Sequence, residues 1–455
     1  MIVNKQELLR SRTCIRARKL ALGAIETALV AADAKVSVKT HVKMKGKTLQ
    51  IKKERFSLDG LDSIYVIGAG KASGHMAEAL FNILDDRIAG GLVIVPDYLD
   101  AKLNTGKIQL WKASHPIPSY RGVKGVMRML TLVHNATKRD LVICLISGGG
   151  SALMPLPYEN LTIKEKQRIT SILLKSGATI QEVNCVRKHL SAIKGGRLAE
   201  HLQNAKTVSL IISDVVGDRL DTIASGPTVP DITTFNDAMH VLKKYNLWQR
   251  LDRNVKCVIE MGLSGKIAET PKPGSKVLRN TRNFVIANNK LTCEASMNYL
   301  KARGINTTVL TTFLRGEASE VGIVVSSIAS EINFRDKPVR KPAAVIMGGE
   351  TTVAVKGRGK GGRNQELVLS ASKGISEFGN TVIISIGTDG IDGNSNAAGA
   401  IADSSTFKRA SKMKLDSDQF LQNNNSNTFF RKLGDTIQTG STGTNVNDVL
   451  ILICL

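Results

Sequence analysis

Short runs of Val, Ile and Leu, separated by segments with helical spacing, constrain the fold of this 455-residue chain more than any other feature. Continuous apolar runs of this length are typical of strands buried on both faces of a sheet. Their alternation with helical segments indicates parallel strands in an α/β fold. We predict strands at residues 63–67, 91–95, 141–146, 207–212, 284–287, 307–310, 343–347, 381–386 and 449–454.

The length of the chain favours two domains. The segment TPKPGS at 270–275 combines two prolines with a glycine, which is typical of a linker, so we expect domains at residues 1–270 and 276–455. Near the N-terminus, apolar residues at helical spacing continue from about residue 8 to residue 29. This spacing favours an amphipathic helix of the folded domain, although Arg10, Arg12, Arg16 and Arg18 would also suit a mitochondrial presequence.

The charge is strongly basic, because 63 Lys and Arg residues face 39 Asp and Glu residues, a formal net charge of +24. The basic residues are dispersed, which suits an enzyme with anionic substrates better than a nucleic-acid or membrane-surface binder. Aromatic residues make up only 4%, too few for base-stacking platforms, and no apolar stretch is long enough to span a membrane. Six cysteines without C-x-x-C spacing indicate free thiols in a reducing compartment. We expect a cytoplasmic protein, with import into mitochondria left open.

Two glycine-rich loops follow predicted strands, where open parallel sheets bind their ligands. In the first loop, Gly68 and Gly70 would let the backbone approach a nucleotide, and Lys71 would add a positive charge. The second loop can wrap a phosphate with its backbone N–H groups. It consists of Ser147, Gly148, Gly149, Gly150 and Ser151. The alternatives are a tight strand–helix turn for the first loop and a flexible turn for the second.

Four further loops carry polar groups that suit phosphate chemistry. Asp214 follows a strand, where its carboxylate could bind Mg²⁺ or orient a substrate hydroxyl, although helix capping would also explain it. Arg363 ends a glycine-rich segment and could clamp a phosphate, the alternative being a solvent-exposed arginine in a hairpin loop. We assign nucleotide binding to the residues of the remaining loops, with Asp389 also a second candidate for the metal. These residues are Gly349, Glu350, Asp389 and Asn445.

One of the seven histidines, His115, follows a strand-like run at 108–113 and is a candidate substrate-binding residue, although a histidine without a second one nearby is more often structural. No second histidine stands at ligand spacing, so we do not expect zinc. The residues therefore predict a two-domain α/β protein that handles phosphate.

Ten segments in order resemble the glycerate kinases of the class II (MOFRL) family, and they cover nearly the whole chain. They are GAGKAS at 68–73, SHPIPS at 114–119, SGGGSAL at 147–153, EVNCVRKHLSAIKGGRLA at 182–199, SDVVGD at 213–218, SGPTVPD at 225–231, GGETTV at 348–353, GKGGRNQE at 359–366, GTDGIDG at 387–393 and TGTNVNDV at 442–449. The resemblance implies a larger N-terminal Rossmann-like domain, a smaller C-terminal α/β domain and an active site in the cleft between them.

The resemblance also implies a reaction: ATP, with Mg²⁺ or another divalent cation, phosphorylates D-glycerate to 2-phosphoglycerate. Lys71 and Arg363 would be the catalytic pair, with Asp214 as a further catalytic candidate. We expect Arg187 and Lys188 to hold the substrate carboxylate. As partners we expect these small molecules, with no nucleic acid and no membrane, and we allow for a homodimer.

Two positions depart from the family pattern: Asn396 replaces an acid and Ser441 replaces a proline. The alternative function is a hydroxypyruvate reductase that holds a nicotinamide cofactor at the first glycine loop. Such an enzyme needs an acid about 20 residues beyond the glycines for the ribose. Asp85 and Asp86 follow Gly70 by only 15 and 16 residues, at a predicted helix end.

Overall fold

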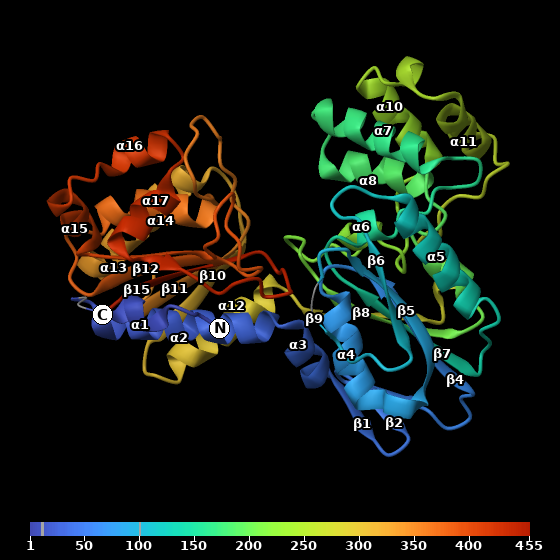
Figure 1. Cartoon of the computed structure of the whole chain (residues 1–455), viewed down its shortest axis with the longest axis horizontal. Helices are drawn as coiled ribbons and strands as arrows, with labels where there is room; N and C mark the ends of the chain where they lie inside the picture. Colours follow the sequence, from blue (N-terminus) through green and yellow to red (C-terminus); the bar gives the residue numbers. More distant parts are fainter. Residues whose placement is uncertain (11–12, 100–101) are drawn as a thin grey trace. The chain divides into compact units, whose positions relative to one another are not determined.

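The computed structural model describes residues 1–10, 13–99 and 102–455. Arg12 lies outside these ranges. The chain divides into two compact units, each with its own sheet (Figure 1). We call residues 34–286 the central unit, and residues 1–33 together with 287–455 the terminal unit. The chain passes between the units at 33–34 and again at 286–287, so this division differs from the expected domains at 1–270 and 276–455.

A six-stranded sheet organises the central unit, in the order β6-β5-β4-β7-β8-β9. Neighbouring strands from β6 to β8 pair in parallel, which confirms the Rossmann-like prediction. In chain order the six strands read 3-2-1-4-5-6, the arrangement of dinucleotide-binding folds. The strands are β4 (Ser63–Ala69), β5 (Ile88–Pro96), β6 (Ile108–Ala113), β7 (Asp140–Ile146), β8 (Lys206–Ile212) and β9 (Thr281–Ala287).

Helices and a small sheet complete the central unit. Helices α7, α8, α10 and α11 gather around an apolar core of their own (Figure 1). Three strands that the sequence did not predict, β1 (Val42–Lys45), β2 (Thr48–Ile51) and β3 (Glu54–Ser57), form an antiparallel sheet. The helices are α3 (Ala34–His41), α4 (Ser73–Leu84), α5 (Tyr120–Val133), α6 (Gly150–Leu153), α7 (Ile163–Lys175), α8 (Ile180–His189), α9 (Arg197–His201), α10 (Phe235–Lys244) and α11 (Arg253–Leu263).

The terminal unit has a mixed sheet, in the order β10-β11-β15-β12-β13-β14. Strands β10 and β11 pair in parallel, as predicted for 307–310 and 343–347, but the other neighbouring strands pair antiparallel, so the prediction of parallel strands at 381–386 and 449–454 is wrong. The strands are β10 (Asn306–Leu314), β11 (Ala343–Gly349), β12 (Thr381–Gly387), β13 (Gly399–Asp403), β14 (Thr436–Ile437) and β15 (Asp448–Cys454).

Helices on both faces of this sheet explain the error. Ile384 and Ile451 face the layer of α2 and α12, whereas Ile383 and Leu452 face α13 and α14 (Figure 1). A strand buried on both faces is apolar throughout, whichever way it runs. The helices of this unit are α1 (Lys5–Leu9), α2 (Ile15–Ala32), α12 (Asn289–Lys301), α13 (Ala318–Arg335), α14 (Arg363–Gly374), α15 (Thr406–Lys412), α16 (Ser417–Gln422) and α17 (Ser426–Leu433).

The expected amphipathic helix near the N-terminus is α2, and its apolar side belongs to the core of the terminal unit. Arg18 of this helix is fully buried. Its Nε donates to Asp403 at 2.5 Å, and its Nη1 donates to Asp435 at 3.0 Å. Arg18, which would suit a presequence, is therefore a core ion-pairing residue. No helix within the described residues has the length and apolar character that a membrane crossing requires.

The TPKPGS segment is held to the central unit by specific contacts. The Thr270 hydroxyl donates to Asp231 at 3.1 Å, and the Asp231 N–H donates to the Pro271 carbonyl at 2.8 Å. Thr270 is buried. The prolines and the glycine therefore shape an anchored turn of the central unit.

Removing Arg18 should destabilise the terminal unit strongly, because two buried carboxylates would lose a partner. We expect Arg18→Met to lower the free energy of unfolding in urea by about 3–5 kcal/mol. Arg16→Met, on the exposed side of the same helix, should change it by less than about 0.5 kcal/mol. Equal effects of the two substitutions would contradict the structural role of the Arg18 ion pairs.

Candidate active site

The strand order of the central sheet reverses between β4 and β7, and both glycine loops predicted from the sequence lie at this point. Strand β4 pairs with β7 up to Ala69 and Ile146, so the loops that begin at Gly70 and Ser147 leave the sheet side by side. In open α/β sheets, ligands bind beside the carboxyl ends of the strands at such a reversal. The topology therefore places both loops at the position where open α/β sheets bind ligands.

Hydrogen bonds join the two loops directly. The Lys71 N–H donates to the Gly148 carbonyl at 2.9 Å, and the Ala72 N–H donates to the Ser147 hydroxyl at 3.0 Å. Gly68 and Gly70 have φ values of +147° and +150°, and a Cβ at either position would overlap atoms of β7 or its loop. These glycines therefore allow a close approach between two protein segments. The same contacts occupy N–H groups at the start of α4 that a dinucleotide pyrophosphate would use.

Three predicted side chains lie around the second loop. A Cβ added to Gly149 would stand 2.9 Å from His115 Nε2 and 3.1 Å from Lys71 Cγ, so these two side chains meet at this glycine. A Cβ added to Gly148 would overlap the Asp214 carboxylate. Burial, together with the positive charge of Lys71, lowers the pKa of His115. The side chains of Lys71, His115 and Asp214 thus lie against this loop.

A cavity of about 210 Å³ adjoins this loop. His115, Gly149, Ser151 and Arg187 were predicted to bind substrate, and all four line it. The other lining residues are Pro116, Pro118, Ala152, Pro155, Lys166, Thr170 and Lys194. Besides His115, the lining has three basic side chains, Arg187, Lys166 and Lys194, and the described lining includes no carboxylate. Such a cavity suits an anionic ligand.

The two buried lysines of the cavity were missed by the sequence analysis. Lys166 donates to the carbonyls of Pro155 and Leu156 at 3.1 and 3.2 Å. Lys194 donates to the carbonyls of Ser151 and Ala224 at 3.0 and 3.4 Å. Burial lowers the pKa of Lys194 to about 7 and that of Lys166 well below its ordinary value. Because the sequence pattern of a buried lysine resembles that of an exposed one, only the fold reveals these residues.

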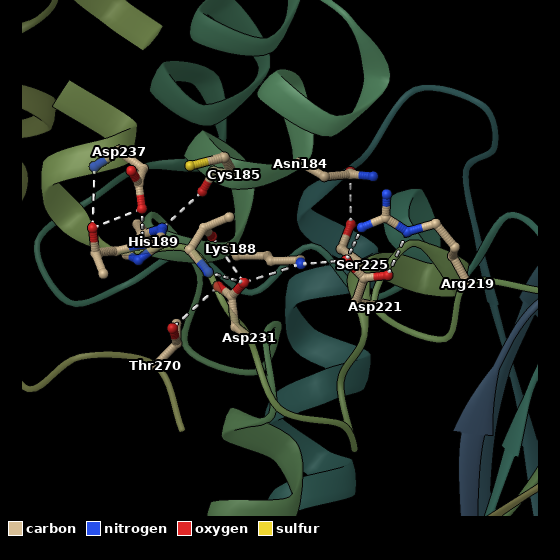
Figure 2. A network of polar contacts seen from close by, with 12 residues as sticks. Asn184, Cys185, Lys188, His189, Arg219, Asp221, Ser225, Asp231, Asp237 and Thr270 are labelled. Atoms are coloured by element: carbon tan, nitrogen blue, oxygen red, sulfur yellow. Dashed lines mark hydrogen bonds and ion pairs between the residues drawn. The ribbon is translucent and has the colours of Figure 1, made fainter. Parts of the chain in front are cut away.

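Lys188 lies outside the described cavity lining, although it is the chain neighbour of Arg187. Figure 2 shows its ammonium directed to Asp231, at 3.2 Å, while Asp221 lies 3.5 Å away. Asp231 also accepts hydrogen bonds from Thr270 and Thr233. Lys188 therefore holds segments of the central unit together in this structure, and of the two predicted carboxylate ligands only Arg187 reaches the cavity.

A turn with unusual backbone geometry supports the cavity from below the loop. Ala224, Ser225 and Gly226 have φ values of +50°, +60° and +60°, which costs about 1–3 kcal/mol for each of the two non-glycine residues. The turn aims the Ala224 carbonyl at Lys194 and brings the Ser225 hydroxyl within 2.7 Å of the Ser151 hydroxyl. Ser225 also donates to Asn184 at 3.2 Å (Figure 2). The strained turn thus fixes two polar groups beside the cavity, the Ala224 carbonyl and the Ser225 hydroxyl.

In the terminal unit, several predicted residues gather at one edge of the sheet. Asp448 at the start of β15 is in register with Gly349 of β11 and Gly387 of β12, so the loops that carry Glu350 and Asp389 leave the sheet next to it. The nearby Asn445 side chain accepts from the Asn447 N–H at 2.9 Å. This edge therefore collects the residues predicted to bind nucleotide, together with Asp448, which was missed.

Arg363 begins α14 and is ion-paired in this structure. Its Nε and Nη2 donate to the two oxygens of Asp448 at 2.5 and 2.9 Å, and its Nη1 lies 3.1 Å from Glu350. Burial alone would lower the pKa of Arg363, but the bond to Asp448 and the charges of Asp448 and Glu350 raise it above its ordinary value. Glu350 is 46% exposed and Asp448 only 10%, so Glu350 is the carboxylate that an incoming anion could displace.

Asp392 fixes the start of the same helix. Its two oxygens accept from the backbone N–H groups of Asn364 and Gln365 at 3.1 and 2.9 Å. Asp392 and Asp448 lie in the GTDGIDG and TGTNVNDV segments, from which we predicted Asp389 and Asn445 as site residues. An acid immediately before a long apolar strand is the signal that could have identified Asp448.

No group of three or more His, Cys, Asp or Glu side chains suited to a metal ion occurs among the described residues. A resident metal cage is therefore not part of this portion of the chain. Mg²⁺ often binds through one or two carboxylates and completes its coordination with substrate phosphates and water. The Asp214 carboxylate beside the glycine loop fits that kind of site.

Two family models match the chain: a domain of unknown function (DUF4147) over residues 20–260 and the MOFRL family over residues 343–448. The glycerate 2-kinase of Pyrococcus horikoshii is 40% identical over 96% of this chain and 97% of its own length. The D-glycerate 2-kinase of Thermotoga maritima is 44% identical, with coverages of 88% and 92%. A protein of Agrobacterium vitis named putative hydroxypyruvate reductase is 40% identical, with coverages of 85% and 98%.

The fold is also that of a solved relative. A crystal structure of the glycerate kinase from Thermotoga maritima matches with a TM-score of 0.86 at 40% sequence identity. The match covers 96% of this chain and 99% of that one.

A methyl group at Gly149 should disturb His115 and Lys71. Gly149→Ala and Gly177→Ala both place an alanine at a φ near +80°, so each should cost about 1–2 kcal/mol of stability. Only the first crowds neighbouring side chains, because Gly177 has open space around its Cα. NMR titration should therefore show the His115 pKa returning toward its ordinary value in Gly149→Ala alone. The same His115 titration in both variants would contradict this geometry.

Proposed function

Because the chain belongs to the family of glycerate kinases with a MOFRL domain, we propose that it transfers the γ-phosphoryl group of ATP to the 2-hydroxyl of D-glycerate. The resemblance inferred from the sequence motifs is confirmed by relatives that match over nearly their whole length. The choice of the 2-hydroxyl follows the names of those relatives, since the geometry of the cavity would admit either hydroxyl.

The observation that carries the proposal is the cationic cavity beside the glycine loop. D-glycerate is a small anion, and Arg187 offers it a guanidinium while Lys166 offers the N–H groups of a buried amine in a space of about 210 Å³. We assign the carboxylate of the substrate to these two residues. In this proposal Lys188 acts indirectly, through its ion pair with Asp231.

The second part of the proposal concerns the phosphates. The loop from Ser147 to Ser151 would hold the transferring group, with Lys71 neutralising the charge that develops on it. Phosphoryl transfer depends mostly on positioning and on such charge stabilisation. Asp214 would hold Mg²⁺ together with phosphate oxygens. When bound, the ion would neutralise phosphate charge during the transfer.

In the terminal unit, we assign Arg363 to phosphate charge as well, with nucleotide contacts from Gly349, Glu350, Asp389 and Asn445. Arg363 already has two carboxylate partners, so a phosphate would take the place of the exposed Glu350 while Asp448 keeps the guanidinium oriented. Asp389 is the second candidate for the metal, and in this structure its carboxylate accepts from the Ile391 N–H at 3.2 Å.

The alternative of a hydroxypyruvate reductase is less well supported. Asp97 does follow β5, where dinucleotide-binding folds carry the acid that binds the ribose. However, the N–H groups of Lys71 and Ala72 at the first glycine loop already bind the neighbouring loop. A pyrophosphate would have to break these contacts, so the geometry favours the kinase.

The product of the reaction tests the proposal directly. Purified protein with ATP, Mg²⁺ and D-glycerate should yield phosphoenolpyruvate as soon as enolase is added, because enolase dehydrates 2-phosphoglycerate. If phosphoenolpyruvate appears only after phosphoglycerate mutase is also added, the 3-hydroxyl is the acceptor. Oxidation of a reduced nicotinamide with hydroxypyruvate, and no ADP from any small hydroxy acid, would favour the reductase.

Substitution of Lys71 should affect turnover far more than folding. Its side chain lies against the glycine loop, and one such stabilising group is worth roughly 2.7–4 kcal/mol in the transition state. We expect Lys71→Ala to lower kcat at least about a hundredfold with an unchanged melting temperature. Lys107→Ala, an exposed lysine of the same unit, serves as the control. Near-normal turnover of the Lys71 variant would remove this residue from the mechanism.

A further inference from the structure

We propose that the amine of Lys194 accepts the proton of the substrate hydroxyl during phosphoryl transfer. The inference rests on the proposed function and concerns a step that the function leaves open. When the hydroxyl oxygen attacks the γ-phosphorus, the O–P bond forms, the bond from the γ-phosphorus to the β,γ-bridging oxygen breaks, and ADP leaves with that electron pair. The hydroxyl proton must then pass to a base, here the Lys194 amine, which becomes an ammonium and later loses the proton to water.

The hydrogen bonds of Lys194 suit a neutral amine. A neutral amine has two N–H groups and one lone pair. Lys194 has two carbonyl acceptors within reach, Ser151 at 3.0 Å and Ala224 at 3.4 Å. Because these two carbonyls can accept both N–H groups, the nitrogen lone pair is left to accept a proton from a third partner. The residue lines the cavity while being only 2% exposed, so the cavity is where a third partner can approach.

Lys194 is also tied to the loop that would hold the phosphoryl group. Its acceptor Ser151 is the last residue of the glycine loop, and its second acceptor, Ala224, belongs to the strained turn that contacts Ser151. Lys166, the other buried lysine, binds Pro155 and Leu156, which lie further along the chain from the loop. The placement therefore assigns the carboxylate to the Lys166 side and the reacting hydroxyl to the Lys194 side.

The buried, basic surroundings of the Lys194 amine lower its pKa. Helix α8 contributes Arg187, α7 contributes Lys166, and the loop after β6 contributes His115. The carboxylate of Asp231 lies against Gly195, but it accepts from Lys188, Thr233 and Thr270. Burial, followed by the charge of Arg187, lowers the pKa of Lys194 to about 7. A general base works best with a pKa near the working pH.

An arginine at this position separates the two roles that a lysine could have. Lys194→Arg keeps a cation in the cavity but cannot accept a proton. We expect kcat to fall by about 10²–10⁴-fold. The KM for D-glycerate should change by less than about threefold, because ground-state binding is retained. Lys166→Arg is the comparison variant: it changes the residue assigned to the substrate carboxylate, so its effect should appear in KM rather than in kcat. Melting temperatures report whether each variant folds.

The pH profile supplies the second readout. In the wild-type protein, kcat/KM for D-glycerate should rise with pH through about 7, because the amine must be deprotonated to act as a base. This acid limb should persist in His115→Asn and in Lys166→Arg, and disappear in Lys194→Arg. An acid limb that disappears in one of the first two variants instead would assign the proton to that residue and overturn the proposal.

Chemical rescue completes the test. Lys194→Ala should regain at least about tenfold in rate with added methylamine or ethylamine, and less with trifluoroethylamine, because the rate should follow the basicity of the free amine. A rescue that ignores amine basicity, or a Lys194→Arg variant with wild-type kcat, would show that Lys194 only binds substrate or holds the loops. If the wild-type protein forms no ADP with D-glycerate, the proposed function fails and this role fails with it.

Discussion

The close approach of β4 and β7 at their carboxyl ends is the constraint on which the site of the central unit depends. Gly68 and Gly70 leave no room for a side chain there, and their absent Cβ atoms let the two loops exchange backbone hydrogen bonds. That contact fixes where Gly149 stands, and hence where Lys71 and His115 meet. The glycines of such a loop are usually explained by the close approach of a ligand, but here they first allow the close approach of another loop.

The second constraint is electrostatic. Arg187, Lys166 and Lys194 share a small cavity whose described lining holds no carboxylate, and the two lysines donate to backbone carbonyls. A neutral ligand would leave this imbalance in place, whereas an anion relieves it. If this cavity binds the substrate as proposed, an acid would be favoured over the corresponding alcohol or amide, because its charge offsets the basic lining.

Site residues that stand directly after a strand could be predicted from the sequence. Site residues whose role depends on contacts with distant segments could not. Lys71, Asp214 and the loop at 147–151 come directly after apolar runs, so the parallel sheet itself brings them together. Arg187 and Lys188 are adjacent on a helix and point about 100° apart, and no local pattern says which one faces the cavity. The burial of Lys194 and the antiparallel pairing of β15 likewise depend on segments remote in sequence.

The place of α2 in the terminal unit has a consequence for biosynthesis. Its core partners on β15 follow it by about 400 residues, which a ribosome adds at 5–20 residues per second, so they appear roughly 20–80 s later. During that interval the whole central unit emerges and can fold. Helix α12, which packs against α2, follows α2 by about 270 residues, so the apolar side of α2 has no native partner during the first part of the interval. The order of translation thus leaves the apolar side of this helix open to a chaperone while the rest of the chain is made. A circular permutation that places α2 after β15 would remove this delay.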